Sequence, residues 1–349
     1  MKKITLAVLF GGCSSEHAVS LHSAAGVLRG LDREKYHVVC VGITQDGRWL
    51  LCPDEPNALE NNTWHTSPAC TPAILSPDRS HHGLLVLAQG GPEVVYLDAV
   101  LPILHGKNGE DGTVQGLLQL AGIPVVGCPL LPSALCMDKH IAHLLAAAAG
   151  IPVTPSALFR AGEDPALLPQ RTAGLTYPLY VKPAGSGSSI GITRVERPEE
   201  LGPAVLAALE HDPKVVMEQE VDGVELGCAV LGCSELTVGE VDMICLQTGF
   251  FDYTEKYNLI TAQIQVPAPI PPETARAARE LACRVYRALE CSGFARVDLS
   301  LTRDGRLLLN EVNTIPGFTS HSRYPGMMAA AGLPFSHLLD RMIETAVAP

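Results

Sequence analysis

The chain has 349 residues, 47% of them hydrophobic, with a formal net charge of −12 and a mean hydropathy of +0.19. This length predicts two to three domains, and the apolar fraction excludes an intrinsically disordered chain. The acidic balance excludes a general nucleic-acid binder, because no basic stripe stands out. It does not exclude a phosphate ligand, since a few local lysines suffice to bind one.

Neither the N-terminus nor any internal run predicts a membrane segment. The opening MKKITLAVLFGG starts like a signal peptide, but Gly11 and Gly12 cut its apolar stretch short and no small-residue cleavage site follows. No apolar run approaches the ~18 residues that span a bilayer. The 11 cysteines stand singly, without a C-x-x-C pair, which favours reduced core thiols over disulfides or a zinc site. We therefore expect a cytoplasmic protein without membrane partners.

Strands alternate with helices over residues 1–130. The run ITLAVLF predicts a strand, the glycines after it a turn, and LHSAAGVLRGL an amphipathic helix. Further strands are predicted at 36–44, 98–106 and 123–128. The alternation predicts an α/β domain with a mostly parallel sheet. Residues 53–82 are rich in Pro, Asn, Ser and His, and we expect an irregular excursion there.

From residue 131 the pattern changes. A helix over 133–150 ends at Gly150. Later strands come in pairs joined by tight turns, such as the turn at Asp222–Gly223. Strands linked by hairpins and flanked by helices predict an α+β second half.

The run FARVDLSLTRDGRLLLNEVN (294–313) carries the strongest chemical signal. If Asp304–Gly305 forms a two-residue turn, Asp298 faces Glu311 and Arg296 faces Asn313. Side chains alternate along a strand, so all four share one face. Two opposed carboxylates repel each other, and a divalent cation removes that cost. Carboxylate and amide oxygens, completed by phosphate oxygens, suit Mg²⁺. The alternative is a solvated polar face neutralised by Arg296.

Two loops have compositions that suit phosphate chemistry. The loop KPAGSGSSIG (182–191) offers free backbone N–H groups and Lys182 for a phosphate, although a flexible hairpin loop looks the same. The run GFFDYTEKY (249–257) mixes aromatic and charged residues, which fits a lid that excludes water. A surface loop pinned by its aromatic residues fits equally well.

Two features near the first strands remain ambiguous. The run HGKNGEDGTVQG (105–116) follows a strand, where ligands bind in α/β sheets. Its acidic pair Glu110–Asp111 could instead cap the next helix. Glu16, after the first strand, has the same two readings: a helix cap or a ligand for an amine.

Seven motifs, in order, resemble those of D-alanine–D-alanine ligases over nearly the whole chain: GGCSSEHAVS, HGKNGEDG, CMDK, VKPAGSGSSIG, DYTEKY, ARVD and NEVNTIPGFT. The likeness is greatest to the vancomycin-resistance D-alanine–D-serine ligases. The resemblance implies an N-terminal, mostly parallel α/β domain (1–130) before a two-lobed ATP-grasp domain, with a central lobe (131–213) and a C-terminal catalytic lobe (214–349). It also implies a homodimer and a role in peptidoglycan precursor synthesis.

The resemblance further implies which residues bind ATP and metal. Two Mg²⁺ ions, for which Mn²⁺ could substitute, would be held by Asp298, Glu311 and Asn313. The ATP phosphates would contact Lys139, Lys182 and Lys256. Glu218 would lie at the adenine and Glu225 at the ribose.

For the amino acids, the resemblance implies a second set of contacts. Glu16 would bind the amino group of the first D-alanine, and His105 would lie near its carboxylate. Ser188 would link Glu16 to Tyr257 and close the lid. Arg296 and the Gly317 amide would form an oxyanion hole, and Ser322 would bind the carboxylate of the second amino acid.

The second substrate is the open question within this resemblance. The ordinary D-alanine–D-alanine pattern has an apolar residue where Arg323 stands, and an arginine can orient a hydroxyl group. D-lactate ligases share the arginine but lack DYTEKY, whereas this chain has Lys256 and Tyr257. We therefore expect D-alanine–D-serine ligation, with D-alanine–D-alanine ligation as the alternative. Asp242 and Phe250 are further candidate determinants of that selectivity.

Overall fold

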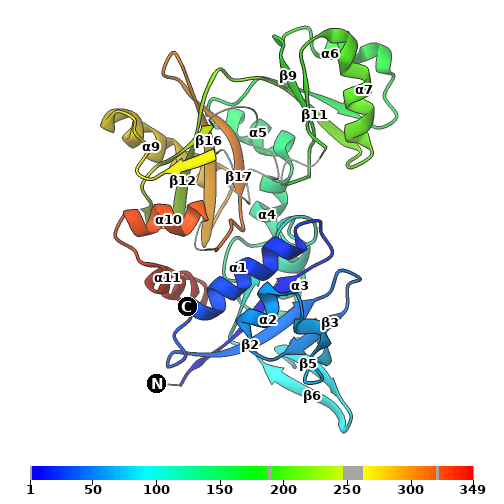
Figure 1. The fold of residues 1–349 in the computed structure, drawn as a ribbon, viewed down its shortest axis with the longest axis vertical. Helices are drawn as coiled ribbons and strands as arrows, with labels where there is room; N and C mark the ends of the chain where they lie inside the picture. Colours follow the sequence, from blue (N-terminus) through cyan, green and yellow to red (C-terminus); the bar gives the residue numbers. More distant parts are fainter. Residues whose placement is uncertain (1, 188–190, 247–261, 320–321, 349) are drawn as a thin grey trace.

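The computed structural model describes residues 2–187, 191–246, 262–319 and 322–348. Four of the predicted site residues lie outside these ranges: Ser188, Phe250, Lys256 and Tyr257. The described part forms three sheets with helices packed around them (Figure 1). The expected combination of α/β and α+β architecture is confirmed.

The first sheet has seven strands in the order β6-β5-β4-β3-β2-β1-β7. Their bounds are β1 Ile4–Gly11, β2 Tyr36–Ile43, β3 Trp49–Cys52, β4 Thr71–Leu75, β5 Gly83–Ala88, β6 Gly91–Tyr96 and β7 Ala99–Ile103. Only β2, β1 and β7 pair in parallel, and every pairing from β2 to β6 is antiparallel. The expectation of a mostly parallel sheet is therefore wrong: the parallel part is confined to β2, β1 and β7, where α1 (His17–Gly30) packs on β1, and the antiparallel strands β3 to β6 extend it.

The predicted irregular excursion over 53–82 is wrong, because this segment contains α2 (Pro56–Glu60), a short 3₁₀ turn (Trp64–Thr66) and β4. Two apolar residues anchor it. Leu59 is fully buried, and the Trp64 ring packs edge-on against Phe10 with centroids 5.2 Å apart. The polar composition of this segment gave no sign of these elements, because only a few apolar side chains pack them against the sheet.

The second sheet is a separate four-stranded unit in the order β10-β9-β11-β8. Its strands are β8 Ser156–Arg160, β9 Leu179–Pro183, β10 Thr193–Val195 and β11 Lys214–Gln219, covered by α6 (Leu168–Arg171) and α7 (Pro198–Leu209). These elements enclose their own hydrophobic core. Because β11 pairs with β8 and β9, we propose a boundary for the central lobe after Gln219 rather than after residue 213.

The third sheet carries the strongest predicted motif. It comprises β12 Gly223–Gly232, β13 Leu236–Val238, β14 Asp242–Leu246, β15 Ala262–Gln265, β16 Phe294–Thr302 and β17 Leu307–Asn313. In the described part of the C-terminal lobe, the helices are α9 Pro272–Ala288, α10 Arg323–Ala330 and α11 Phe335–Val347. The connection from the first sheet runs through α3 Thr113–Ala121, α4 Leu130–Met137 and α5 Lys139–Ala148.

The β16–β17 hairpin confirms the predicted pairings of Arg296 with Asn313 and of Asp298 with Glu311. The predicted two-residue turn is wrong. Thr302 pairs with Arg306 around a three-residue loop, in which Gly305 adopts φ +85°. That longer loop moves the register by one residue, and an irregularity beyond Leu299, at Asn310, moves it back. The two offsets cancel before the polar residues are reached.

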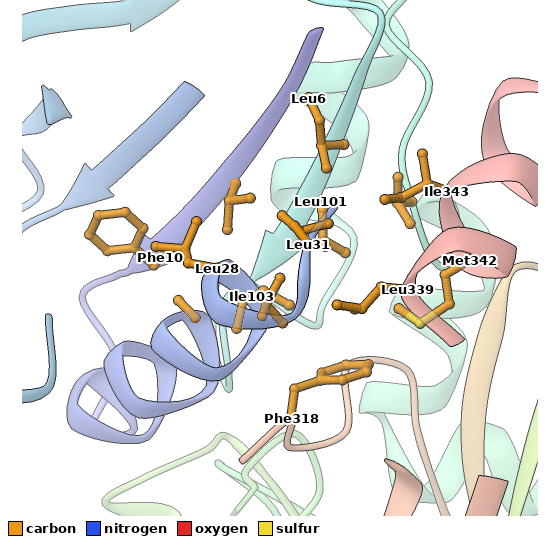
Figure 2. Close-up of a cluster of buried hydrophobic side chains, with 14 of the residues drawn as sticks. Leu6, Phe10, Leu28, Leu31, Leu101, Ile103, Phe318, Leu339, Met342 and Ile343 are labelled. Carbon is orange, nitrogen blue, oxygen red and sulfur yellow. The ribbon is translucent and has the colours of Figure 1, made fainter. Parts of the chain in front are cut away.

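The first and third sheets share one hydrophobic core. The core contains Leu28 of α1 and Leu31 directly after it, Leu101 and Ile103 of β7, Leu339 and Met342 of α11, and Phe318 (Figure 2). The N-terminal sheet and the C-terminal lobe are thus packed as one unit, whereas the central lobe stands apart at the top of Figure 1.

Two further predictions concern the cysteines and membrane-spanning segments. All 11 cysteines are free thiols, and Cys228 is buried in the core of the third sheet. Among the described residues, none of the helices combines the length and apolarity that crossing a bilayer requires.

Candidate active site

A cavity of about 1040 Å³ lies where the three sheets meet. Residues from both halves of the chain line it. Of the predicted site residues, it is lined by Glu16, His105, Lys139, Glu225, Arg296, Glu311, Asn313, Gly317, Ser322 and Arg323. The structure therefore brings together motifs that are up to 300 residues apart in the sequence.

The β16–β17 face supplies the candidate metal ligands. Asp298 is 1% exposed, and it accepts hydrogen bonds from Arg296 Nε (2.7 Å) and Nη2 (2.6 Å) and from Asn313 Nδ2 (2.9 Å). Opposite it, Glu311 lies 3.5 Å from Lys139 Nζ. Cations thus balance both carboxylates.

This donor set fits Mg²⁺, which takes oxygen ligands and is commonly held by one or two carboxylates plus substrate phosphates. The described residues contain no group of three or more His, Cys, Asp or Glu side chains arranged to hold a metal. Two carboxylates, Asp298 and Glu311, and the Asn313 amide could hold the ion only together with phosphate oxygens.

The central lobe contributes groups suited to a nucleotide. Lys182 Nζ forms a 2.5 Å ion pair with Glu218 Oε2. The other carboxylate oxygen of Glu218 is buried and has no hydrogen-bond partner within the described part of the chain. A buried acceptor without a partner is costly, so this oxygen fits a ligand donor such as an amino group. Lys139 Nζ donates to Ser186 O (2.8 Å) and anchors the glycine-serine loop beside it.

Glu16 lines the cavity beside the glycine-serine loop. It precedes α1 but makes no side-chain capping bond, so the helix-cap reading is wrong. Its carboxylate is 6% exposed and lies between two glycines: a Cβ at Gly106 would be 2.4 Å from Glu16 Oε2, and one at Gly187 would be 3.1 Å away. Only glycine lets both loops approach this carboxylate so closely.

The two acidic residues of the 105–116 loop, Glu110 and Asp111, make different contacts. Asp111 closes the turn before α3, where its oxygens accept from Asn108 N (2.8 Å) and Thr113 N (3.0 Å). Glu110 faces the cavity, and its Oε2 accepts from Gly106 N (2.7 Å). Burial and the neighbouring charge of Glu16 raise the pKa of Glu110 to about 8.

His105 occupies the cavity wall, but protein groups take both of its ring nitrogens. Nδ1 lies 3.0 Å from Ile315 O, and Nε2 lies 3.1 Å from Ser23 Oγ. Burial lowers the pKa of His105, so the ring is neutral. These bonds leave neither nitrogen free for the predicted contact with a substrate carboxylate. Nothing in the sequence pointed to Ser23 except a hydroxyl on the buried face of an apolar helix.

The loop after β17 places Gly317 beside Ser322. A Cβ at Gly317 would lie 2.7 Å from Ser322 Oγ. The Ser322 hydroxyl also bonds to the backbone N (2.9 Å) and the hydroxyl (2.8 Å) of Thr319, which fixes its direction. An amide and a hydroxyl thus converge on one end of the cavity.

Arg323 opens α10, and its guanidinium group is buried among carboxylates. Nε and Nη2 donate to the two oxygens of Asp242 (2.8 and 2.7 Å), and Nη1 donates to Glu225 Oε1 (2.7 Å). Asp298 Oδ1 lies 3.6 Å from Nη1. We expected Arg323 to orient a substrate hydroxyl directly or through a neighbour; in the structure its donors bind carboxylates of β12 and β14, which leaves the route through a neighbour.

Comparison with known proteins identifies relatives for the whole chain. Residues 5–128 match the family model "D-ala D-ala ligase N-terminus", and residues 145–344 match "D-ala D-ala ligase C-terminus". A Streptomyces coelicolor protein, provisionally named a D-alanine–D-lactate ligase, is 51% identical over 99% of both chains. The vancomycin B-type resistance protein VanB of Enterococcus faecalis is 47% identical over 99% of both chains. The crystal structure of the VanG D-Ala:D-Ser ligase from Enterococcus faecalis superposes with a TM-score of 0.92 at 48% identity, covering 99% of this chain and 100% of that one.

Proposed function

The chain belongs to the D-alanine–D-alanine ligase family of ATP-dependent ligases, and on this premise we propose that it joins D-alanine to D-serine through an acyl phosphate. The product would enter peptidoglycan precursor synthesis and serve vancomycin resistance, as the name of the VanB relative indicates for that protein. A homodimer and a cytoplasmic location belong to the same proposal.

Activation of the first D-alanine would use the metal face. A carboxylate is a poor electrophile, so its phosphorylation by ATP must come first. Two Mg²⁺ ions on Asp298, Glu311 and Asn313 would supply charge neutralisation when bound. Lys139 and Lys182 would contact the phosphates, and Glu16 would hold the ammonium group of the D-alanine.

Bond formation would use the Gly317 end of the cavity. The amine of the second amino acid would attack the acyl phosphate carbonyl carbon, and negative charge would develop on the carbonyl oxygen. Collapse of this tetrahedral intermediate would break the carbon–oxygen bond to the phosphate, so that inorganic phosphate leaves and the nitrogen loses a proton to give the amide. Arg296 and the Gly317 amide would stabilise that oxyanion. Ser322, whose hydroxyl direction is fixed by Thr319, would bind the carboxylate of the attacking amino acid.

One observation supports D-serine as the second substrate. Beside Ser322, the cavity wall carries the ion pair of Arg323 and Glu225 rather than an apolar surface. A charged wall favours a side chain that bears a hydroxyl group over a methyl group. The VanG relative is named a D-Ala:D-Ser ligase, so the same second substrate is ascribed to that protein. D-alanine remains the alternative, because nothing on this wall excludes a smaller side chain.

A competition experiment tests the proposal. D-serine, D-alanine and D-lactate are offered to the enzyme with ATP, Mg²⁺ and D-alanine, and the products are counted by mass spectrometry. We expect kcat/KM for D-serine to exceed that for D-alanine by about tenfold or more, because a polar site discriminates strongly by hydrogen bonding. A preference for D-alanine would establish the alternative, and a preference for D-lactate would refute both assignments.

A further inference from the structure

The loop from Thr314 to Gly317 connects the candidate metal ligand Asn313 to the candidate oxyanion donor. It belongs to the C-terminal lobe, but the side chains that hold its backbone come from α1 and from the loop after β7 in the N-terminal domain. Ile315 is 3% exposed at the boundary between the two. The position of the Gly317 amide therefore depends on contacts across this boundary.

The 105–110 loop holds the Ile315 backbone. The Ile315 carbonyl oxygen lies 3.0 Å from His105 Nδ1, and the Ile315 backbone N–H lies near enough to the Glu110 carboxyl group to oppose the rise in its pKa. Glu110 is itself fixed by Gly106 N at 2.7 Å. One short loop of the N-terminal domain thus holds the peptide two residues before Gly317.

A third side chain holds the peptide after Gly317. Because a carbonyl oxygen only accepts, His105 must carry its proton on Nδ1, and Nε2 is then an acceptor. The Ser23 hydroxyl, 3.1 Å away, donates to Nε2, and its oxygen accepts from Phe318 N at 3.3 Å. The chain of bonds from Phe318 through Ser23 and His105 to Ile315 brackets Gly317 on both sides.

We propose that Ser23, His105 and Glu110 are positioning residues that clamp the 314–318 backbone and so aim the Gly317 amide at the developing oxyanion. This inference rests on the proposed function. An oxyanion donor must be preorganised, and a misplacement of about 1 Å lowers the rate about 10²-fold. The clamp gives the N-terminal sheet a part in the chemical step besides binding the first D-alanine.

Variants of the acidic pair test the clamp, with kcat and KM measured for ATP and D-alanine. Glu110→Ala removes the acceptor, and we expect kcat to fall about 100-fold while both KM values stay within about twofold, since the affected interaction forms only in the transition state. Glu110→Gln keeps one acceptor oxygen, so we expect a loss of about tenfold. If the alanine variant fails to fold, Glu110→Gln and Ser23→Ala report on the same backbone.

Asp111→Asn is the matched control, because its carboxylate closes the adjacent turn without touching Ile315. Its kcat should stay near the wild-type value. A kcat for Glu110→Ala no lower than that of Asp111→Asn overturns the proposal. A raised KM for D-alanine with unchanged kcat also overturns it, because Glu110 would then bind substrate directly.

The failure of the clamp is distinguishable from failure of the proposed function. A wild-type chain that forms no ligation product with any of the three second substrates refutes the function. A wild-type chain that ligates, together with Glu110 and Ser23 variants of unchanged kcat, refutes the clamp alone.

Discussion

At the scale of single residues, Arg323 shows how burial changes the meaning of a side chain. The sequence places an arginine where the ordinary D-alanine–D-alanine pattern has an apolar residue, which pointed to a role in substrate choice, either direct or through a neighbour. In the structure all of its nitrogens donate to Asp242 and Glu225, and Asp242 is fully buried. Arg323 must therefore influence selectivity through the charge and rigidity that it gives the cavity wall.

We predict that Arg323→Leu destabilises the fold by about 3–5 kcal/mol, because it leaves the buried Asp242 carboxylate without its partner. Urea unfolding measures the change. Adding Asp242→Asn should recover part of the loss, since it removes the uncompensated charge. Arg303→Leu is the control, because the Arg303–Asp222 pair is 83% and 71% exposed; such pairs contribute at most about 1 kcal/mol. Equal losses in Arg323→Leu and Arg303→Leu would contradict the prediction.

At the scale of elements, the β16–β17 hairpin decides whether the metal ligands meet. Its register depends on the irregularity at Asn310, and the Asn310 carbonyl oxygen lies 2.7 Å from His143 Nε2 of α5. The helix therefore holds the strand at the point where its register is restored.

We predict that His143→Ala lowers the free energy of unfolding by about 1 kcal/mol, because the partly buried Asn310 carbonyl loses its donor. It should also weaken divalent-ion binding, since Glu311 follows Asn310 directly. Titration with Mn²⁺, followed by electron paramagnetic resonance in the presence of ATP, measures the second effect. His140→Ala on the same helix is the control. Unchanged Mn²⁺ affinity in a destabilised His143→Ala variant would restrict the contact to a stabilising role.

The same hairpin shows what could be predicted from sequence. Alternation and the Asp–Gly pair identified Asp298 opposite Glu311, because side-chain periodicity is local. The compensating irregularity was missed because the contact of Asn310 with His143 of α5 is not local in the sequence. The loop length was missed because the Asp–Gly pair alone did not reveal the hydrogen bonds of Thr302 with Asp304 and Arg306. Likewise, the clamp on Ile315 joins residues about 200 positions apart, and no local pattern encodes such a contact. Leu59 and Trp64 were missed because their packing partners lie on other elements.

At the scale of the whole molecule, the cavity lies between two bodies with different cores. The N-terminal sheet shares a core with the C-terminal lobe, and the central lobe has its own. Candidate nucleotide contacts come from both bodies. Lys182 and Glu218 belong to the central lobe, whereas Lys139 of α5 and Glu311 of β17 lie outside its sheet. A ligand that contacts both bodies should therefore restrict the motion of the central lobe relative to the rest of the molecule.

We predict that a non-hydrolysable ATP analogue with Mg²⁺ slows amide hydrogen exchange in β9 and β11, because ligand binding stabilises the folded central lobe by mass action. Hydrogen-exchange mass spectrometry measures the change by peptide. Strands β5 and β6, at the far end of the N-terminal sheet, are the internal control and should be unaffected (Figure 1). Equal slowing in β5–β6 and in β9–β11 would contradict a nucleotide site between the two bodies.

The shared core of Figure 2 also constrains how the protein is made. Leu28 and Leu31 leave the ribosome early, but their partners Leu339 and Met342 lie roughly 310 residues later in the chain, which at 5–20 residues per second is roughly 15–60 s of synthesis. Strand β7 supplies Leu101 and Ile103 to this core early, but the part of the apolar surface that α11 covers stays exposed until the end of synthesis. The folding of the N-terminal domain is therefore completed only when the last helix of the chain has been made.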